Sequence, residues 1–213
     1  MSHKVIACIG DSLTEGDYGV LNTLGIANVH AKNYPYFLQE LSGCEVKNFG
    51  HCGFTSLMIL DLFIKGKINV AGSDIIVILL GTNGGQTKAG DSDNDLAYKQ
   101  IIKLCREQSP NAQIFVCTPP KVTQNPNRPG YSYRDNAKNG YEFVIELAKE
   151  DKALKLIDLY NELEFDLHND LMMSPNDGLH FGEYGYFKIA ETIYRHIKKI
   201  IKSFRCRKSD IML

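Results

Sequence analysis

An unbroken apolar run near the start of the chain, Val5 to Ile9, stops abruptly at Gly10-Asp11-Ser12. A short continuous apolar run that is bounded by turn residues is typical of a strand buried on both faces of a sheet. In open α/β sheets, ligands bind just beyond the carboxyl ends of such strands. The run therefore favours an α/β fold, and it places the Ser12 hydroxyl where a nucleophile could act if a base reaches it.

The rest of the chain alternates apolar runs with amphipathic stretches and shows no internal repeat. Further strands are expected over residues 45–49, 74–80, 113–118 and 154–159. Helices are expected over residues 33–41, 55–64, 93–108, 140–151 and 183–203. Strands that alternate with helices indicate βαβ units, and hence a parallel sheet with helices on both faces. We therefore predict an α/β fold with a five-stranded parallel sheet, in a single domain that spans residues 1–213.

Composition and charge narrow the class of protein. Hydrophobic residues make up 44% and charged residues 23% of the chain, as is ordinary for a soluble globular domain. A net charge of −1 gives no basic surface that would indicate nucleic-acid binding. We interpret the basic run over 198–208 as a solvated helix face and a tail at about 204–213. No apolar segment approaches the length of a membrane span, and the N-terminal residues do not resemble a signal peptide.

The six cysteines are scattered and form no CxxC pair: Cys8, Cys44, Cys52, Cys105, Cys117 and Cys206. Several lie in apolar, strand-like contexts, so we interpret them as reduced core thiols rather than as a disulfide frame or a zinc site. The histidines His30, His51 and His168 are not spaced as metal ligands with one another. These features predict a cytoplasmic protein without a metal or a cofactor.

Turn or polar residues follow three of the predicted strands. Ser12 follows the first, Gly53 closes the turn after the second, and Asn83 comes shortly after the run over 74–80. Because parallel strands end at the same edge of a sheet, these three residues can converge. An acid and an imidazole, Asp177 and His180, lie three residues apart before the last predicted helix.

These five residues supply the parts that acyl transfer to a serine requires. A hydroxyl is a poor nucleophile until a base takes its proton, and histidine suits that role because its unperturbed pKa is about 6.5. An acid on the other ring nitrogen fixes the tautomer, and preorganised donors meet the oxyanion. Ser12, His180 and Asp177 fit the first three roles. The backbone N–H of Gly53 and the side-chain amide of Asn83 are suitable oxyanion donors.

In four blocks the chain resembles the SGNH hydrolases, which are also called GDSL-type lipases and esterases. The blocks are Gly10-Asp11-Ser12-Leu13-Thr14, Asn48-Phe49-Gly50-His51-Cys52-Gly53 followed by Thr55-Ser56, Gly81-Thr82-Asn83, and Asp177-Gly178-Leu179-His180. Their order and spacing are similar to those of the family from residue 5 to about residue 195. The resemblance implies a flavodoxin-like, three-layer α/β/α sandwich.

The resemblance also implies a role for each residue of the constellation. Ser12 would be the nucleophile, His180 the base and Asp177 the third member of the triad. The N–H of Ser12, the N–H of Gly53 and the amide of Asn83 would form the oxyanion hole. One departure exists, because the third block of the family often continues Gly-x-Asn-Asp and Gly84 follows Asn83 here. This departure concerns the geometry of the loop more than the chemistry.

Each motif taken alone has a structural explanation. Asp11 and Ser12 could merely cap a helix, Gly53 could end a strand, and Asn83 could turn the chain. Asp177 could begin a short turn, and a single histidine is more often structural than catalytic. These explanations do not predict the order and placement of all the blocks together, and the conjunction favours a serine hydrolase.

Other functions fit the sequence less well. Asp11 could accept a phosphoryl group and Asp17 could bind a metal, but this hypothesis leaves Asn83 and the Asp177–His180 pair without a role. The Gly-rich loop over 15–19 could cradle a phosphate, as in a flavin-binding module, but it lacks a run of hydroxyls. A fold kept only to bind a ligand or partner stays an alternative; its signature would be a lost triad member, and none is lost.

The resemblance implies ester hydrolysis, with acetylated sugars, lysophospholipids, thioesters or simple acetates as substrates. The polar stretch over 121–139 is too long for a plain connection and favours a binding loop, in which the candidate residues are Arg128, Tyr131, Tyr133 and Arg134. Because no long apolar segment could line an acyl-chain groove, we expect a small acyl group on a polar or carbohydrate-like alcohol. His51, Tyr131 and Arg134 are the candidate contacts. Alternatively the loop packs on itself, or the protein is a lysophospholipase or thioesterase.

Overall fold

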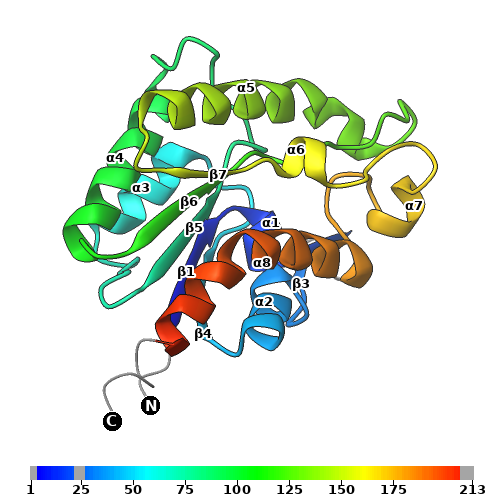
Figure 1. Cartoon of the computed structure of the whole chain (residues 1–213). Helices are drawn as coiled ribbons and strands as arrows, with labels where there is room; N and C mark the ends of the chain where they lie inside the picture. Colours follow the sequence, from blue (N-terminus) through cyan, green and yellow to red (C-terminus); the bar gives the residue numbers. More distant parts are fainter. Residues whose placement is uncertain (1–3, 22–26, 207–213) are drawn as a thin grey trace.

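The computed structural model describes residues 4–21 and 27–206 of the chain. Its central sheet has five parallel strands in the order β4-β1-β5-β6-β7 (Figure 1). The strands are β1 (Val5–Gly10), β4 (Glu45–Gly50), β5 (Ile75–Leu79), β6 (Gln113–Cys117) and β7 (Lys155–Ile157). This is the flavodoxin-like order, and it confirms the predicted five-stranded parallel sheet.

Helices cover both faces of the sheet, as the three-layer prediction requires (Figure 1). One layer contains α2 (Tyr34–Ser42) and α8 (Glu183–Cys206). The other contains α3 (Ser56–Ile64), α4 (Asp93–Gln108) and α5 (Arg134–Glu150). Alternate residues of β1 belong to different cores: Ile6 and Cys8 pack with α2 and α8, whereas Ala7 and Ile9 pack with α3, α4 and α5.

Burial on both faces explains why the strands are continuous apolar runs rather than alternating ones. In β5, Ile75, Val77 and Leu79 point into one core and Ile76 and Ile78 into the other. All five are buried. Fully burying a side chain of this size contributes about 1.5–3 kcal/mol, so this strand anchors both layers to the sheet.

Two parts of the chain differ from the prediction. The predicted loop over 121–139 has no helix or strand over 121–128, but its second half forms a 3₁₀ turn, η1 (Pro129–Tyr133), followed by α5, which begins at Arg134 instead of residue 140. The sequence does not indicate that the helix begins at Arg134, because its first turn is mostly polar and only Ala137 there is buried. The expected loop over 15–19 is also wrong in part, since β2 (Asp17–Leu21) and β3 (Ala27–Val29) form an antiparallel pair.

Three short helices complete the described chain: α1 (Ser12–Glu15), α6 (Leu159–Glu162) and α7 (Asp170–Met173). At the C-terminal end, α8 continues to Cys206. The first residues of the expected tail at about 204–213 are therefore helical, and residues 207–213 lie outside the described part.

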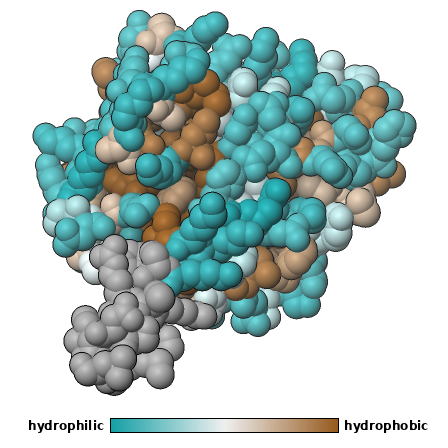
Figure 2. Space-filling model, viewed as in Figure 1, coloured by the Kyte–Doolittle hydropathy of each residue, from teal (hydrophilic) through white to brown (hydrophobic). Residues whose placement is uncertain are grey.

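Cys8, Cys44, Cys105 and Cys117 are buried free thiols, as predicted, whereas Cys52 is half-buried. The side chain of Cys206 lies outside the described residues. Within residues 4–21 and 27–206, no helix combines the length and the apolar character that crossing a membrane requires. Figure 2 shows one face of the molecule, on which hydrophilic residues predominate and hydrophobic ones gather between α5 and β7.

Candidate active site

Three motif blocks meet at the carboxyl edge of the sheet because their strands are neighbours. Gly10 at the end of β1 pairs with Gly50 of β4 on one side and with Leu79 of β5 on the other. The segments that follow are joined directly, since the His51 N–H donates to the Gly10 carbonyl oxygen over 3.1 Å. The predicted convergence of these blocks is therefore what the fold produces.

A chain of hydrogen bonds links the residues predicted to form the triad. The Oγ atom of Ser12 lies 2.9 Å from Nε2 of His180, and Nδ1 of His180 lies 2.7 Å from Oδ2 of Asp177. The other carboxylate oxygen of Asp177 accepts hydrogen bonds from the N–H groups of Leu179 and His180, each over 2.8 Å. With Asp177 ionised, His180 donates from Nδ1, and the lone pair on Nε2 can accept the Ser12 proton.

Asp11 fixes the position of Ser12. Its Oδ1 accepts the Leu13 N–H over 3.0 Å, so it is the N-cap of α1, and Ser12 is the first residue of that helix. Burial raises the pKa of the Asp11 carboxyl to about 6. The capping explanation of Asp11 is thus correct, and its full burial argues against attack of this carboxylate on a phosphoryl donor.

The His180–Asp177 pair shifts the pKa of both groups. Burial disfavours the imidazolium, but the hydrogen bond and charge of Asp177, with the charges of Asp17 and Asp11, outweigh burial and raise the pKa of His180 above its ordinary value. For Asp177, burial is likewise the largest single influence, yet the bond and charge of His180 and the two backbone N–H groups prevail and lower its pKa. The site therefore favours the charged form of each group.

The predicted oxyanion residues lie on two loops that are bonded to each other. Asn83 Nδ2 donates to the Phe54 carbonyl oxygen over 3.0 Å, which fixes the orientation of the amide and leaves its second N–H for another acceptor. Gly53 has φ +77°, a conformation that L side chains rarely adopt, and it is exposed. The loop after Asn83 is closed by a turn from the Gly84 N–H to the Gly81 carbonyl oxygen (3.1 Å), despite the departure at Gly84.

The segment that carries Asp177 and His180 is held by residues 123–130. The Thr123 N–H donates to the Gly178 carbonyl oxygen and the Gly130 N–H to the Asp177 carbonyl oxygen, each over 2.8 Å. Arg128 forms an ion pair with Asp170 at 2.5 Å and also donates to the Ser174 carbonyl oxygen. Arg128 is therefore committed to structure, and the sequence-based interpretation that it belongs to a substrate-binding set is not supported.

Residues 8–187 match the sequence model of the GDSL-like Lipase/Acylhydrolase family. The chain belongs to this family. Membership makes the protein a hydrolase of carboxylic esters, and it confirms the resemblance seen in the motif blocks. Among curated protein sequences, none matches the chain significantly.

Solved structures show the same fold at low sequence identity. The aryl esterase of M. smegmatis has a TM-score of 0.71 and 19% identity, with 92% of this chain and 99% of that chain covered. A carbohydrate acetylesterase family member from Sinorhizobium meliloti has a TM-score of 0.69 and 19% identity, with 93% and 99% covered. A further carbohydrate acetylesterase from that organism has a TM-score of 0.72 and 15% identity, with 92% and 99% covered. The GDSL-like protein is thus similar to esterases of the SGNH hydrolase fold along most of its length.

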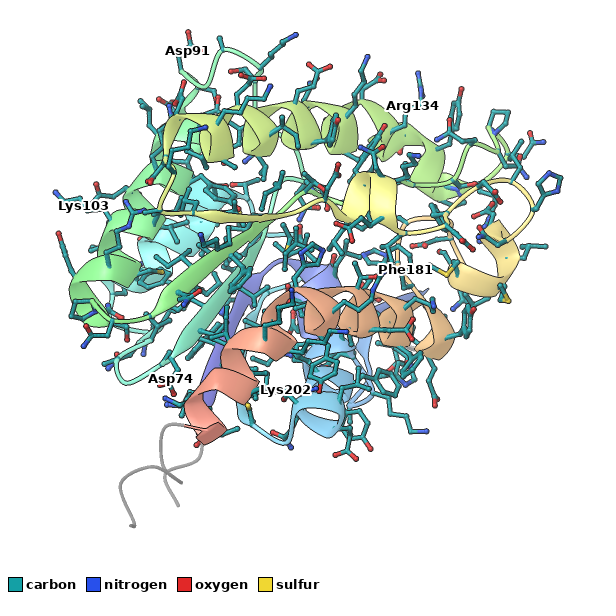
Figure 3. All side chains as sticks on the ribbon, viewed as in Figure 1. Asp74, Asp91, Lys103, Arg134, Phe181 and Lys202 are labelled. Carbon is teal, nitrogen blue, oxygen red and sulfur yellow. The ribbon has the colours of Figure 1, made fainter. Side chains whose placement is uncertain are left out.

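The candidate substrate contacts lie on different segments: His51 follows β4, Tyr131 lies in η1 and Arg134 begins α5. His51 is half-buried in the turn that contains Gly53, with its ring centroid 5.2 Å from that of Phe54. The Arg134 guanidinium lies 4.2 Å from the Tyr131 ring centroid, and Arg134 also donates to the Tyr131 carbonyl oxygen over 3.3 Å. Figure 3 shows Arg134 at the start of α5. Part of the loop therefore packs on itself, although Tyr131 and Arg134 both stay partly exposed.

Sequence reasoning missed one acidic residue near the histidine. Asp17 Oδ2 lies 3.6 Å from His180 Nε2, and the Asp17 side chain is almost fully buried. The sequence suggests only a metal-binding role for Asp17. Among the described residues, no group of three or more His, Cys, Asp or Glu side chains is arranged to hold a metal ion. No local signal in the sequence marks Asp17, because its neighbours there are not its neighbours in the fold.

Proposed function

We propose that this protein is a serine esterase that cleaves carboxylic esters through an acyl-enzyme on Ser12. The observation that carries the proposal is the unbroken chain from Ser12 to His180 to Asp177, with distances of 2.9 and 2.7 Å. A nucleophile, a base and an orienting acid within hydrogen-bond reach are the arrangement that acyl transfer requires. Family membership is consistent with that chemistry.

The proposed reaction proceeds in two halves. His180 Nε2 takes the Ser12 proton while Oγ attacks the ester carbonyl carbon, and the imidazolium then gives that proton to the leaving alcohol oxygen. A water molecule repeats the sequence on the acyl-enzyme, so that Ser12 is regenerated and the carboxylic acid leaves. Asp177 stabilises the imidazolium in both halves.

The negative oxygen of each tetrahedral intermediate needs donors in place before the reaction. We assign this role to the N–H groups of Ser12 and Gly53 and to the free amide N–H of Asn83. The bond from Asn83 to the Phe54 carbonyl oxygen supports the assignment, because it presents the amide nitrogen to the loop that contains Gly53.

For the substrate we propose a short, acetyl-like acyl group on a polar or carbohydrate-like alcohol. His51, Tyr131 and Arg134 remain partly exposed, and they offer an aromatic face with polar groups beside it. Structural neighbours named as carbohydrate acetylesterases share the fold, which makes acetylated sugars the first natural esters to test.

One observation favours a longer acyl group instead. Leu57 and Met58, at the start of α3 and just beyond Gly53, are both 43% exposed. Apolar side chains this close to the oxyanion loop could receive an acyl chain, as a lysophospholipase or a thioesterase would need. A protein that only binds a ligand on this fold is the remaining alternative.

Hydrolysis of p-nitrophenyl acetate and p-nitrophenyl octanoate, measured side by side, tests the proposal. The native protein is expected to turn over the acetate faster, and Ser12→Ala is expected to abolish turnover of both esters while the fold is retained. Mass spectrometry after treatment with a fluorophosphonate should show one adduct on Ser12 of the native protein. Activity that persists in Ser12→Ala contradicts the mechanism, and a clear preference for octanoate contradicts the short-acyl proposal alone.

A further inference from the structure

The imidazole of His180 lies between two carboxylates, one at each ring nitrogen. Asp177 Oδ2 is 2.7 Å from Nδ1, and Asp17 Oδ2 is 3.6 Å from Nε2. Nε2 is the atom that accepts the Ser12 proton in the proposed mechanism. We propose that Asp17 is a second carboxylate partner of His180, which stabilises the imidazolium at the nitrogen where the proton is transferred. This inference rests on the proposed function.

Hydrogen bonds to neighbouring segments fix the position of Asp17. Its Oδ1 accepts the Gly19 N–H over 2.8 Å, and its carbonyl oxygen accepts the Tyr186 hydroxyl over 2.5 Å. The next carbonyl oxygen, that of Tyr18, accepts from Asn176 Nδ2 over 2.7 Å. Strand β2 is therefore tied both to α8 and to the segment that carries the triad. These bonds leave Oδ2 of Asp17 directed toward the ring.

Gly19 brings the same strand against Asp177. A Cβ atom placed on Gly19 would lie 2.5 Å from the carboxyl carbon and Oδ2 of Asp177, and φ is +72° at this position. A glycine is thus required for β2 to approach so closely. As a result, the carboxylates of Asp17 and Asp177 are both fixed relative to one imidazole.

The effect of Asp17 depends on the state of the ring. In neutral His180, Nε2 presents a lone pair to Ser12, and a nearby carboxylate gains nothing from it. When the proton moves from Ser12 Oγ to Nε2, an N–H with positive charge faces Asp17 Oδ2. The attraction exists only in the charged state, so it lowers the barrier to each proton transfer onto Nε2. Passage of the proton to the leaving oxygen returns the ring to its neutral form.

Three carboxylates favour the charged ring, each from a different part of the chain: Asp177 from its own segment, Asp17 from β2 and Asp11 from the N-cap of α1. Burial opposes the imidazolium, yet these charges together raise the pKa of His180. Two further titratable groups lie near Asp17, namely Tyr186 and Cys52. Burial raises the pKa of both, so they remain neutral where the enzyme would be assayed.

The test compares kcat/KM for p-nitrophenyl acetate across about pH 5–9 in the native protein, Asp17→Asn and Asp91→Asn. Asparagine keeps the size of the side chain and the acceptor for the Gly19 N–H, so the substitution removes the charge and places an amide NH2 where Oδ2 faced the ring. Asp91 is the matched control, because it is exposed, lies on the loop before α4, and is well separated from Phe181, the residue that follows His180 (Figure 3). We expect Asp17→Asn to lose on the order of tenfold at the pH plateau.

The pH profile separates a charge effect from a structural one. Asp17→Asn is expected to move the acidic limb of the profile to lower pH, whereas Asp91→Asn should overlay the native curve. A residue that merely supported the fold would lower kcat without moving the limb. If Asp17→Asn folds poorly, Asp17→Ser is a second neutral variant, whose hydroxyl can still accept the Gly19 N–H.

A titration of His180 by NMR makes the inference independent of activity. It uses the Ser12→Ala protein with and without Asp17→Asn, and the His180 signal is identified by its loss in His180→Gln. The midpoint should fall when Asp17 is neutralised. An unchanged midpoint overturns the inference even if the esterase is active. A shifted midpoint in a protein that cleaves no ester supports the contact and counts against the proposed function alone.

Discussion

Replacing Arg128 by methionine is expected to destabilise the fold by about 3–5 kcal/mol, because it leaves the Asp170 carboxylate buried without its charge partner. The guanidinium and the carboxylate are 2.5 Å apart, and their side chains are only 10% and 6% exposed. The substitution also removes the hydrogen bond to the Ser174 carbonyl oxygen. Since proteins of this size are stable by about 5–15 kcal/mol, the loss is a large fraction of the total.

The free energy of unfolding is measured by urea denaturation, monitored by far-UV circular dichroism. A lower midpoint with an unchanged slope would show that the native state has lost stability. Arg134→Met is the matched control, because Arg134 is 40% exposed and its pair with Asp135 is long, at 3.5 Å. Exposed ion pairs contribute about 0–1 kcal/mol, so the control should remain close to the native protein.

A double variant tests the reason for the loss. Adding Asp170→Asn to Arg128→Met removes the uncompensated charge, and the amide oxygen can still accept the Thr123 hydroxyl, which donates to Asp170 Oδ2 over 2.6 Å. The double variant should therefore be less destabilised than the sum of the single variants. If Arg128→Met stays within about 1 kcal/mol of the native protein, the argument from a buried ion pair is wrong.

Three further predictions concern the candidate site. Asn83→Ala should lower kcat on the order of 10²–10³-fold with little effect on stability, as the loss of one oxyanion donor does, and near-native turnover in steady-state assays would refute the assignment. The acidic limb of kcat/KM should have its midpoint above the ordinary histidine value of 6.5, because Asp177 and the other carboxylates raise the pKa of His180 and only the neutral ring can take the Ser12 proton. Conversely, the stability contributed by the charged His180–Asp177 pair is complete below pH 6.5 until Asp177 is protonated, and it is lost as pH rises through the raised pKa. A midpoint of the acidic limb of kcat/KM at or below pH 6.5 would contradict this electrostatic account.

The central sheet could be predicted because each of its strands is covered by helices on both faces. A strand covered on both faces must be apolar at successive positions, so Val5–Ile9 and the run over 74–80 are marked in the sequence without reference to any distant residue. The start of α5 carries no such mark. Its first turns are mostly polar, and only Ala137 and Gly140 are buried there. The local sequence around Arg134 is therefore typical of a loop, and only the packing of α5 on the sheet reveals the helix.

The three motif blocks at the sheet edge were predictable for a topological reason. Parallel strands end at one edge of the sheet. Because Gly10 pairs with Gly50 and with Leu79, the segments that carry Ser12, Gly53 and Asn83 all begin at that edge. Asp177 and His180 were found by the chemistry that Ser12 requires and by the order of the motifs. That reasoning identifies residue types that must be present, but it does not identify what holds them.

Sequence reasoning missed the structural environment of two charged residues, Asp17 and Arg128. Both side chains are buried by contacts with distant segments. Asp17 is fixed by Tyr186, 169 residues away, and its strand by Asn176, while the buried Arg128 pairs with Asp170, 42 positions further along. A charged residue in a polar stretch is usually solvated, so local composition argues against burial in each case. Burying a charge is costly unless a partner compensates it, and here Asp17 lies beside His180 and Arg128 beside Asp170. The same two residues are therefore where neutral substitutions should separate stability from catalysis: the loss at Arg128 falls mainly on folding, and the loss at Asp17 falls on proton transfer.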